Sequence, residues 1–234
     1  LTAIALLSVS GVANADAMLA QDDFVGISFW VISMGMLAST AFFFFMRALT
    51  ISNDKKWVSD WSNFDSRIHF GMDIIHDILE KSEVSATFFV VGWIAEKYPE
   101  IVRKISECGF EIATHTHLHQ LVYEQDRKTF FNDVERSIKI LEDTAGKKVR
   151  IFRAPGFSIT ENNKWAFEVL HDLGIEIDAS IFPASRAHGG LPSYKESKPS
   201  ILKYNGIKLK EFPINTHNAF GKSLIFSGGG YFRI

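Results

Sequence analysis

The pattern of apolar and polar positions changes near residue 47. Phe24 to Met46 is an unbroken apolar run without a charged residue, and a transmembrane helix needs about 20 such residues. Beyond it, apolar positions at helical spacing predict helices over residues 68–79, 99–109, 128–144 and 161–173. Short runs rich in β-branched and aromatic residues predict strands over residues 86–91, 110–114, 149–152 and 175–182, and near Leu209. Helices that alternate with strands predict parallel β-α units, and residues 185–200 read as a long loop.

The first 47 residues predict a membrane-targeted segment. Residues 1–15 read LTAIALLSVSGVANA and end in an A-x-A arrangement, which is typical of a signal peptide without its basic start; a core helix is the alternative. Residues 22–47 then form the predicted transmembrane helix, with 24–46 in the membrane. Acids precede this span, and Arg47, Lys55 and Lys56 follow it, so the positive-inside rule places the following domain on the cytoplasmic side of the inner membrane.

The composition of the chain argues against several kinds of function and binding site. The chain has 234 residues, of which 47% are hydrophobic, so one full domain with a sizeable core is expected. A net charge of −2 gives no basic face for nucleic acid. Cys108 is the one cysteine, which excludes an intrachain disulfide and a cysteine-based zinc site. Because the chain begins with Leu1 rather than Met, the reading frame is expected to be incomplete.

Polar residues follow several of the predicted strands. His115, Arg153 and Asp178 each come at or near the end of one, and the carboxyl ends of parallel strands converge on one face of an α/β barrel. His115 and His119 are four residues apart on a turn, a spacing at which both rings reach one metal ion while His117 points elsewhere. Structural or solvated histidines are the alternative.

The apolar segment resembles a known family. DDFVGISFWVISMGMLASTAFFFFMR is similar to the N-terminus and first helix of a proteorhodopsin. The function of that family needs seven helices and a retinal-binding lysine on the last. No second apolar span follows here, so neither retinal nor proton pumping is expected.

A second resemblance covers the remaining chain. The stretches ATFFVVGWIAEKYPEIVRKISECGFEIATHTHLHQLVYEQ, FRAPGFSIT, IDASIFP, EFP and GGGYFR resemble polysaccharide deacetylases with a NodB-type domain, in the branch associated with exopolysaccharides. The resemblance begins at about residue 48 or 61. It implies a domain over 48–234, truncated at its C-terminus, with an incomplete distorted (β/α) barrel. It further implies a divalent metal, most often Zn²⁺, and hydrolysis of N-acetyl groups on an amino-sugar polysaccharide, a carbon–nitrogen bond that is not a peptide bond.

The resemblance also assigns roles to single residues. The family motif H-[S/T]-x-x-H makes His115 and His119 metal ligands, with Thr116 holding the loop. In the motif R-x-P-x-[F/Y], which includes Pro155, Arg153 orients the catalytic carboxylate, and the backbone N–H of Phe157 stabilises the oxyanion. A plain structural ion pair is the alternative for Arg153.

The acetyl-binding groove is implied in the same way. Asp178, Ile181 and Pro183 match the motif that lines it, although core and loop roles are equally open for Ile181 and Pro183.

The acidic motif of the family departs from its pattern. The branch reads ALTVDVED where residues 48–55 read ALTISNDK, so Asp54 is the one acid left as a third metal ligand, or is an ordinary turn residue. The late histidine of the family, which follows GGGYFR, is also missing. The sequence therefore predicts an impaired deacetylase. The alternatives are a catalytically dead, membrane-tethered carbohydrate-binding remnant, a chimeric reading frame, and a rhodopsin fragment with an unrelated tail.

Overall fold

The computed structural model describes residues 9–10, 67–185, 189–219 and 222–225 of the chain. Its centre is a seven-stranded sheet in the order β1-β2-β3-β4-β5-β7-β6. The parallel strands are β2 (Thr87–Val90), β3 (Glu111–Thr114), β4 (Ile151–Phe152), β5 (Ile177–Asp178) and β7 (Ile207–Glu211). The edge strands β1 (Val9–Ser10) and β6 (Ser200–Tyr204) run antiparallel to their neighbours. A separate hairpin is formed by β8 (Thr216–Ala219) and β9 (Lys222–Ile225).

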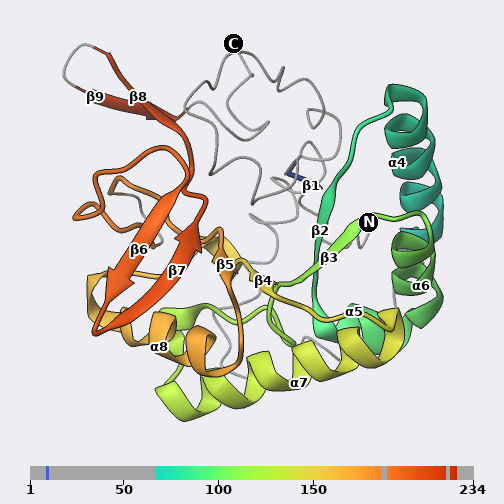
Figure 1. Ribbon diagram of the computed structural model, residues 1–234, viewed down its shortest axis with the longest axis horizontal. Helices are drawn as coiled ribbons and strands as arrows, with labels where there is room; N and C mark the ends of the chain where they lie inside the picture. The colour runs from blue at the N-terminus through green and yellow to red at the C-terminus, as the bar shows by residue number, and fades with distance from the viewer. Residues whose placement is uncertain (1–8, 11–66, 186–188, 220–221, 226–234) are drawn as a thin grey trace.

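Helices follow one another around the outer side of the strands (Figure 1). They are α4 (Ile68–Ser82), α5 (Gly92–Lys97), α6 (Pro99–Glu107), α7 (Arg127–Ala145) and α8 (Trp165–Asp172). Short 3₁₀ turns occur at η2 (Val122–Glu124), η3 (Pro155–Phe157) and η4 (Glu161–Asn163).

Local sequence sets the ends of these helices. Asp126 caps α7 by accepting a hydrogen bond from the Thr129 backbone N–H at 2.7 Å, and Gly146 ends that helix with a left-handed φ of 66°. Pro99 stands at the first position of α6, where its missing N–H costs no helical hydrogen bond.

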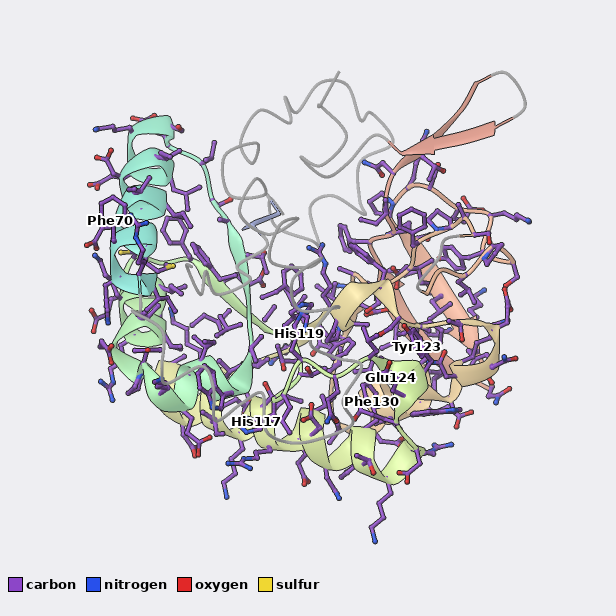
Figure 2. All side chains as sticks on the ribbon, turned by 180° about the vertical axis from the view of Figure 1, so that it is seen from behind. Phe70, His117, His119, Tyr123, Glu124 and Phe130 are labelled. Carbon is purple, nitrogen blue, oxygen red and sulfur yellow. The ribbon has the colours of Figure 1, made fainter. Side chains whose placement is uncertain are left out.

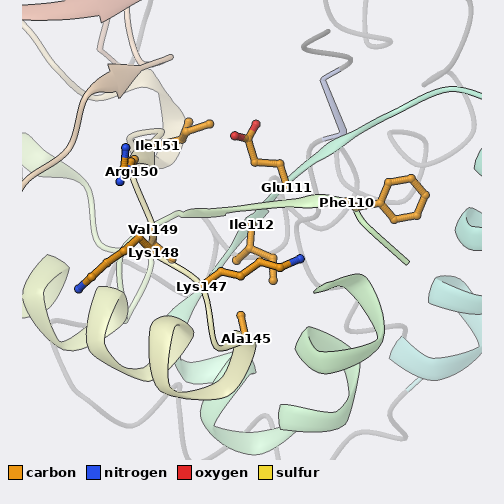
Figure 3. A pocket seen from close by; sticks show the side chains of 9 residues that line it. All are labelled: Phe110, Glu111, Ile112, Ala145, Lys147, Lys148, Val149, Arg150 and Ile151. Carbon is orange, nitrogen blue, oxygen red and sulfur yellow. The ribbon is translucent and has the colours of Figure 1, made fainter. Parts of the chain in front are cut away.

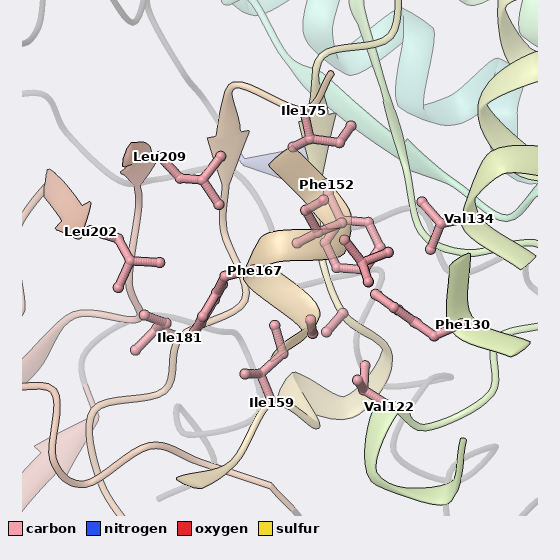
Figure 4. Packing of buried hydrophobic residues seen from close by; sticks show 14 of the residues in the cluster. Val122, Phe130, Val134, Phe152, Ile159, Phe167, Ile175, Ile181, Leu202 and Leu209 are labelled. Atoms are coloured by element: carbon pink, nitrogen blue, oxygen red, sulfur yellow. The ribbon is translucent and has the colours of Figure 1, made fainter. Parts of the chain in front are cut away.

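Two apolar clusters fill the space between helices and sheet. The larger packs α7 and α8 against β4 and β7, with Phe130, Phe152 and Phe167 almost inaccessible to solvent (Figure 4). The second packs α4 and α6 against β2. A third, smaller cluster around Phe89 contains Ala113, Ile151 and Ala179. Because neighbouring strand residues point to opposite faces, Phe88 joins the helix-side cluster while Phe89 faces the inner side of the sheet.

The mixed α/β class predicted from the sequence is confirmed, and each predicted helix is present with small shifts at its ends. Some details differ. The predicted strands 149–152 and 175–182 are regular only at Ile151–Phe152 and Ile177–Asp178. The elements α5, β1, β6, β8 and β9 were not predicted. No pairing among the described residues joins the β1 edge to the β6 edge, so closure into a barrel stays a prediction.

Several predictions fall on the N-terminal 66 residues. β1 lies within the predicted signal peptide; the rest of that segment, the predicted span at 24–46 and Asp54 lie outside the described residues. Among the helices that the structure does describe, none combines the length and the apolar character that crossing a bilayer requires.

Candidate metal and active site

The loop after β3 brings two histidine rings together. The His115 backbone N–H donates to the Val90 carbonyl at 3.0 Å, which continues the pairing of β3 with β2. Thr116 and His119 then adopt left-handed φ values of 65° and 58°, a conformation that costs non-glycine residues about 1 kcal/mol or more. The Thr116 hydroxyl accepts from the His119 N–H at 3.0 Å, as the resemblance implies. The rings of His115 and His119 lie 5.0 Å apart between centroids.

Both rings are suited to bind a cation. His115 Nδ1 lies 2.7 Å from the Arg153 carbonyl oxygen; as the donor in that contact it leaves Nε2 available. Burial lowers the pKa of His115 well below its ordinary value, and burial lowers the pKa of His119 to about 4. The two imidazoles are therefore neutral at pH 7, as metal ligands must be. His119 Nε2 is buried and has no hydrogen-bond partner among the described residues, so a missing partner such as a metal ion fits this atom.

His117 points toward α5 and helps to hold the loop in place. Its buried ring lies 3.7 Å from the Glu96 carboxylate of α5, measured from Nε2 to Oε2. Figure 2 shows His119 in the interior and His117 closer to α7. The prediction that His117 points away from the other two rings is confirmed.

Helix α7 holds the same loop through two polar side chains. The buried Asp133 carboxylate accepts from the backbone N–H groups of His117 at 2.8 Å and Leu118 at 3.1 Å. One turn later, the Ser137 hydroxyl donates to the Thr116 carbonyl at 3.1 Å. Neither residue was predicted from the sequence. Their signal was position, because Asp133 and Ser137 lie four residues apart on the face of α7 that also buries Phe130, Val134 and Leu141.

The first residues of α5 complete the support. The backbone N–H of Gly92 donates to the Thr116 carbonyl at 2.9 Å, and that of Trp93 to the His117 carbonyl at 3.1 Å. A Cβ atom at Gly92 would lie 2.7 Å from His117 Nδ1 and 2.9 Å from Ser137 Cα, so the close approach of α5 to this loop requires glycine.

Arg153 follows β4 and is partly buried beside the histidine loop. Its backbone N–H donates to the Thr114 carbonyl, and its Nε donates to the Ala179 carbonyl, both at 3.1 Å. The guanidinium carbon stands 4.1 Å from the centroid of the Phe89 ring, a cation–π geometry. Burial lowers the pKa of Arg153 to about 10, against the opposing effect of two buried carboxyls, so the side chain is still a cation at pH 7.

Phe157 sits on a tight turn after Arg153. Gly156 and Phe157 have φ values of 60° and 53°. The Phe157 N–H, the predicted oxyanion donor, donates to the Ala154 carbonyl at 3.2 Å, and its carbonyl accepts from Gly190 N–H at 3.1 Å. An oxyanion would have to share or replace the bond to Ala154, so this role stays a prediction. Pro155 is buried at the start of the same turn.

The three residues predicted to line the acetyl-binding groove lie in different environments. Asp178 is fully buried at the end of β5 and accepts a short hydrogen bond from the Ser180 hydroxyl. Ile181 is fully buried in the larger core cluster, which agrees with its structural alternative. Pro183 is half-buried in the following loop. Glu211, which received no role from the sequence, is fully buried at the end of β7 and accepts from the Ile181 N–H at 3.1 Å.

The structure thus brings His115, His119, Arg153 and Phe157 together at the carboxyl ends of β3 and β4, with Asp178 at the end of β5. Within the described ranges, no group of three histidine, cysteine or acidic side chains is arranged to hold a metal ion. His115 and His119 are the two predicted ligands within those ranges, and the predicted third, Asp54, lies outside them.

A cavity of about 200 Å³ lies at the opposite, amino-terminal ends of β3 and β4 (Figure 3). It is lined by Phe110, Glu111, Ile112, Ala145, Lys147, Lys148, Val149, Arg150 and Ile151. Each of its cations already has a partner: Lys147 donates to the Ser106 carbonyl, Lys148 to Glu142 and Arg150 to Glu176. We therefore assign no ligand to this cavity.

Comparisons with known proteins identify relatives among the polysaccharide deacetylases. A family model described as polysaccharide deacetylase matches residues 54–177, and a model of a domain of unknown function (DUF3473) matches residues 179–234. A peptidoglycan-N-acetylglucosamine deacetylase of Bacillus cereus is 37% identical over 95 residues, which are 40% of this chain and 34% of that protein. A chitooligosaccharide deacetylase of Sinorhizobium fredii is 37% identical over 62 residues, 26% of this chain and 27% of that protein.

One solved structure adds evidence on the fold. A crystal structure of a protein from Mycobacterium smegmatis, described as a polysaccharide deacetylase, superposes with a TM-score of 0.52 and 29% identity, over 62% of this chain and 46% of that one. The matched regions span less than half of these relatives.

Proposed function

Because the chain belongs to the polysaccharide deacetylase family, whose model covers residues 54–177, we propose that it hydrolyses N-acetyl groups on an amino-sugar polysaccharide. The two curated relatives named above are deacetylases of peptidoglycan N-acetylglucosamine and of chitooligosaccharide. Their names support a glycan that carries N-acetylated amino sugars as the substrate class. The same proposal includes two further points: the chain belongs to the branch associated with exopolysaccharides, and its sheet closes into a barrel.

The observation that carries the proposal is the neutral pair of the buried His115 and the partly buried His119. The two ring centroids lie 5.0 Å apart in an edge-to-face arrangement, and the His119 Nε2 atom is buried without a partner among the described residues. Both ring nitrogens of His76 and Nδ1 of His117 also lack partners, so what distinguishes His119 is the second imidazole ring directly beside it. A divalent metal, Zn²⁺ by the nitrogen ligand set, would satisfy both rings.

We propose that His115, His119 and Asp54 hold this metal. When bound, it would polarise the acetyl carbonyl and lower the pKa of a water molecule. The chain itself keeps both imidazoles deprotonated through burial, and the hydrogen bond from His115 Nδ1 to the Arg153 carbonyl fixes the orientation of that ring. Asp133 and Ser137 hold the loop between the two ligands.

Arg153 contributes a partly buried positive charge next to this loop. With a carboxylate restored at position 52 or 55, Arg153 would orient that group as the general base on water. The segment ISNDK at residues 51–55 supplies only one acid where the family has several. If Asp54 serves as metal ligand, no acid of that segment is left as base, and general acid–base groups contribute about 10²–10⁴ in rate. We therefore propose that the chain has low activity.

The test is zinc-dependent release of acetate from a chitooligosaccharide by the full chain in detergent. We expect slow release by the parent, faster release by Ser52→Asp/Lys55→Asp, and loss of release when His115→Ala is added to that double variant. His171→Ala is the matched control because His171 is exposed on α8. Full activity in the parent would contradict the proposed impairment. No release by the folded double variant would favour the second candidate, a carbohydrate-binding protein without catalysis, which the missing acids of residues 51–55 support.

A further inference from the structure

Two carboxyl side chains lie side by side inside the sheet. Asp178 on β5 and Glu211 on β7 are direct partners in the register of these parallel strands, and neither is accessible to solvent. One oxygen of each carboxyl accepts a hydrogen bond from a neighbouring residue. Asp178 Oδ1 accepts from the Ser180 hydroxyl, and Glu211 Oε1 accepts from the Ile181 backbone N–H at 3.1 Å.

The two remaining oxygens are Asp178 Oδ2 and Glu211 Oε2. Both are buried, and among the described residues no N–H or O–H group donates to either of them. Because Asp178 and Glu211 are paired in the strand register, these two unpartnered oxygens belong to neighbouring carboxyl groups. An ionised carboxylate can only accept, so a proton on one of the two groups would supply the donor that both oxygens lack.

The charges around the pair also favour one proton shared between the two carboxyls. Arg153 is a partly buried cation whose charge interacts with both carboxyls. Tyr194, whose charge would also interact with them, is neutral at pH 7, because a tyrosine is neutral there and burial raises its pKa further. One proton on the pair leaves a single negative charge opposite a single positive charge. Two adjacent ionised carboxylates in this buried place would repel each other strongly.

We propose that Glu211 is a positioning residue that shares one proton with Asp178, so that the singly charged pair balances Arg153 and Glu211 fixes Ile181. As a role in deacetylation this rests on the proposed function, whereas the shared proton itself does not. Burial raises the pKa of both carboxyls, and the neighbouring charge of Asp178 raises that of Glu211 further. Glu211 lies in the part of the chain that the second family model covers, so that part contributes a side chain to the site.

The first test measures the proton by infrared spectroscopy on the full chain in detergent. At pH 7.5 an ordinary carboxyl is ionised, because its pKa is near 4. We expect the parent to show the carbonyl band of a protonated carboxylic acid and Glu211→Gln to lack it, while exposed Glu135→Gln on α7 retains it. An unchanged band in Glu211→Gln, or no band in the parent, would overturn the proposal.

The second test uses the pH dependence of folding in urea. A carboxyl whose pKa is raised in the folded state stabilises the fold fully below the unfolded pKa and loses that contribution as pH rises toward the folded pKa. Above the unfolded pKa, the folding equilibrium constant of the parent should therefore fall relative to that of Glu211→Gln, by up to about tenfold per pH unit, until the pH passes the folded pKa. A constant ratio would overturn the proposal.

Glutamine suits both tests because its amide oxygen can still accept from Ile181 and its NH₂ group can donate to Asp178. Glu211→Ala should instead lower stability at every pH, because the Ile181 N–H loses its acceptor. Neither readout needs catalytic activity, so failure of the proposed function would show only in acetate release, and failure of the shared proton only here.

Discussion

Replacing Asp133 by alanine should loosen the loop that carries the two histidines. The carboxylate accepts from the backbone N–H groups of His117 at 2.8 Å and Leu118 at 3.1 Å, and only 9% of the residue is exposed. Removing it leaves two donors in a largely buried place without their acceptor. The rings of His115 and His119, on either side of this segment, then lose part of their fixed orientation.

The magnitude follows from these contacts. A hydrogen bond to a charged group contributes about 1.5–3 kcal/mol, and two such bonds are lost. Burial raises the pKa of Asp133, so desolvation of the carboxylate offsets part of this gain. Taking the lower value for each bond and about 1 kcal/mol for desolvation, we expect Asp133→Ala to lower the free energy of unfolding by about 2 kcal/mol. Asp133→Asn should lose a similar amount, because its NH₂ group would face a backbone donor.

The assay is urea unfolding of the full chain in detergent, followed by tryptophan fluorescence. Asp143→Asn, an exposed acid on the same helix, is the matched control and should stay within about 0.5 kcal/mol of the parent. Support around ligands commonly contributes about tenfold or more to metal affinity, so Asp133→Ala should also weaken zinc binding. A loss in Asp133→Ala no larger than in the control would refute the reasoning.

Two further predictions concern packing and location. Gly92→Ala should lower the free energy of unfolding by about 1–3 kcal/mol, because the new Cβ would overlap His117 and Ser137, whereas Gly71→Ala in the open interior of α4 should raise it by up to about 1 kcal/mol in the same urea assay. Cys108 is exposed, so if the domain lies on the cytoplasmic side as the charges around residues 24–46 predict, a membrane-impermeant maleimide should label it only after cells are lysed; labelling of intact cells would reverse the orientation.

Long, strongly patterned elements were predictable from the sequence. Helix α6 begins at Pro99 and α7 ends before Gly146, and both residues carry their signal locally. Helix α5 was missed because it is six residues long and begins at Gly92, which reads as the end of a strand. Strand β6 was missed because it is an edge strand with alternating exposure that directly follows a polar loop.

The same contrast holds at the site. The spacing of His115 and His119 predicts a ligand pair without any knowledge of the fold. Asp133 acts on that pair from another element, so only its position on the buried face of α7 could have revealed it. Glu211 follows Leu209 by two residues, so its side chain lies on the same buried face of β7. The lysines on either side of these positions obscure that pattern in the sequence. The contacts of both acids depend on how distant elements pack, which sequence spacing alone does not encode.

Isothermal titration of the full chain with Zn²⁺ measures whether His115 and His119 form a metal site. We expect the parent to bind about one Zn²⁺ per chain. Binding should be lost in His115→Ala and in His119→Ala and unchanged in His171→Ala, whose histidine is exposed on α8. Equal zinc affinity in the parent and in His115→Ala would contradict this prediction.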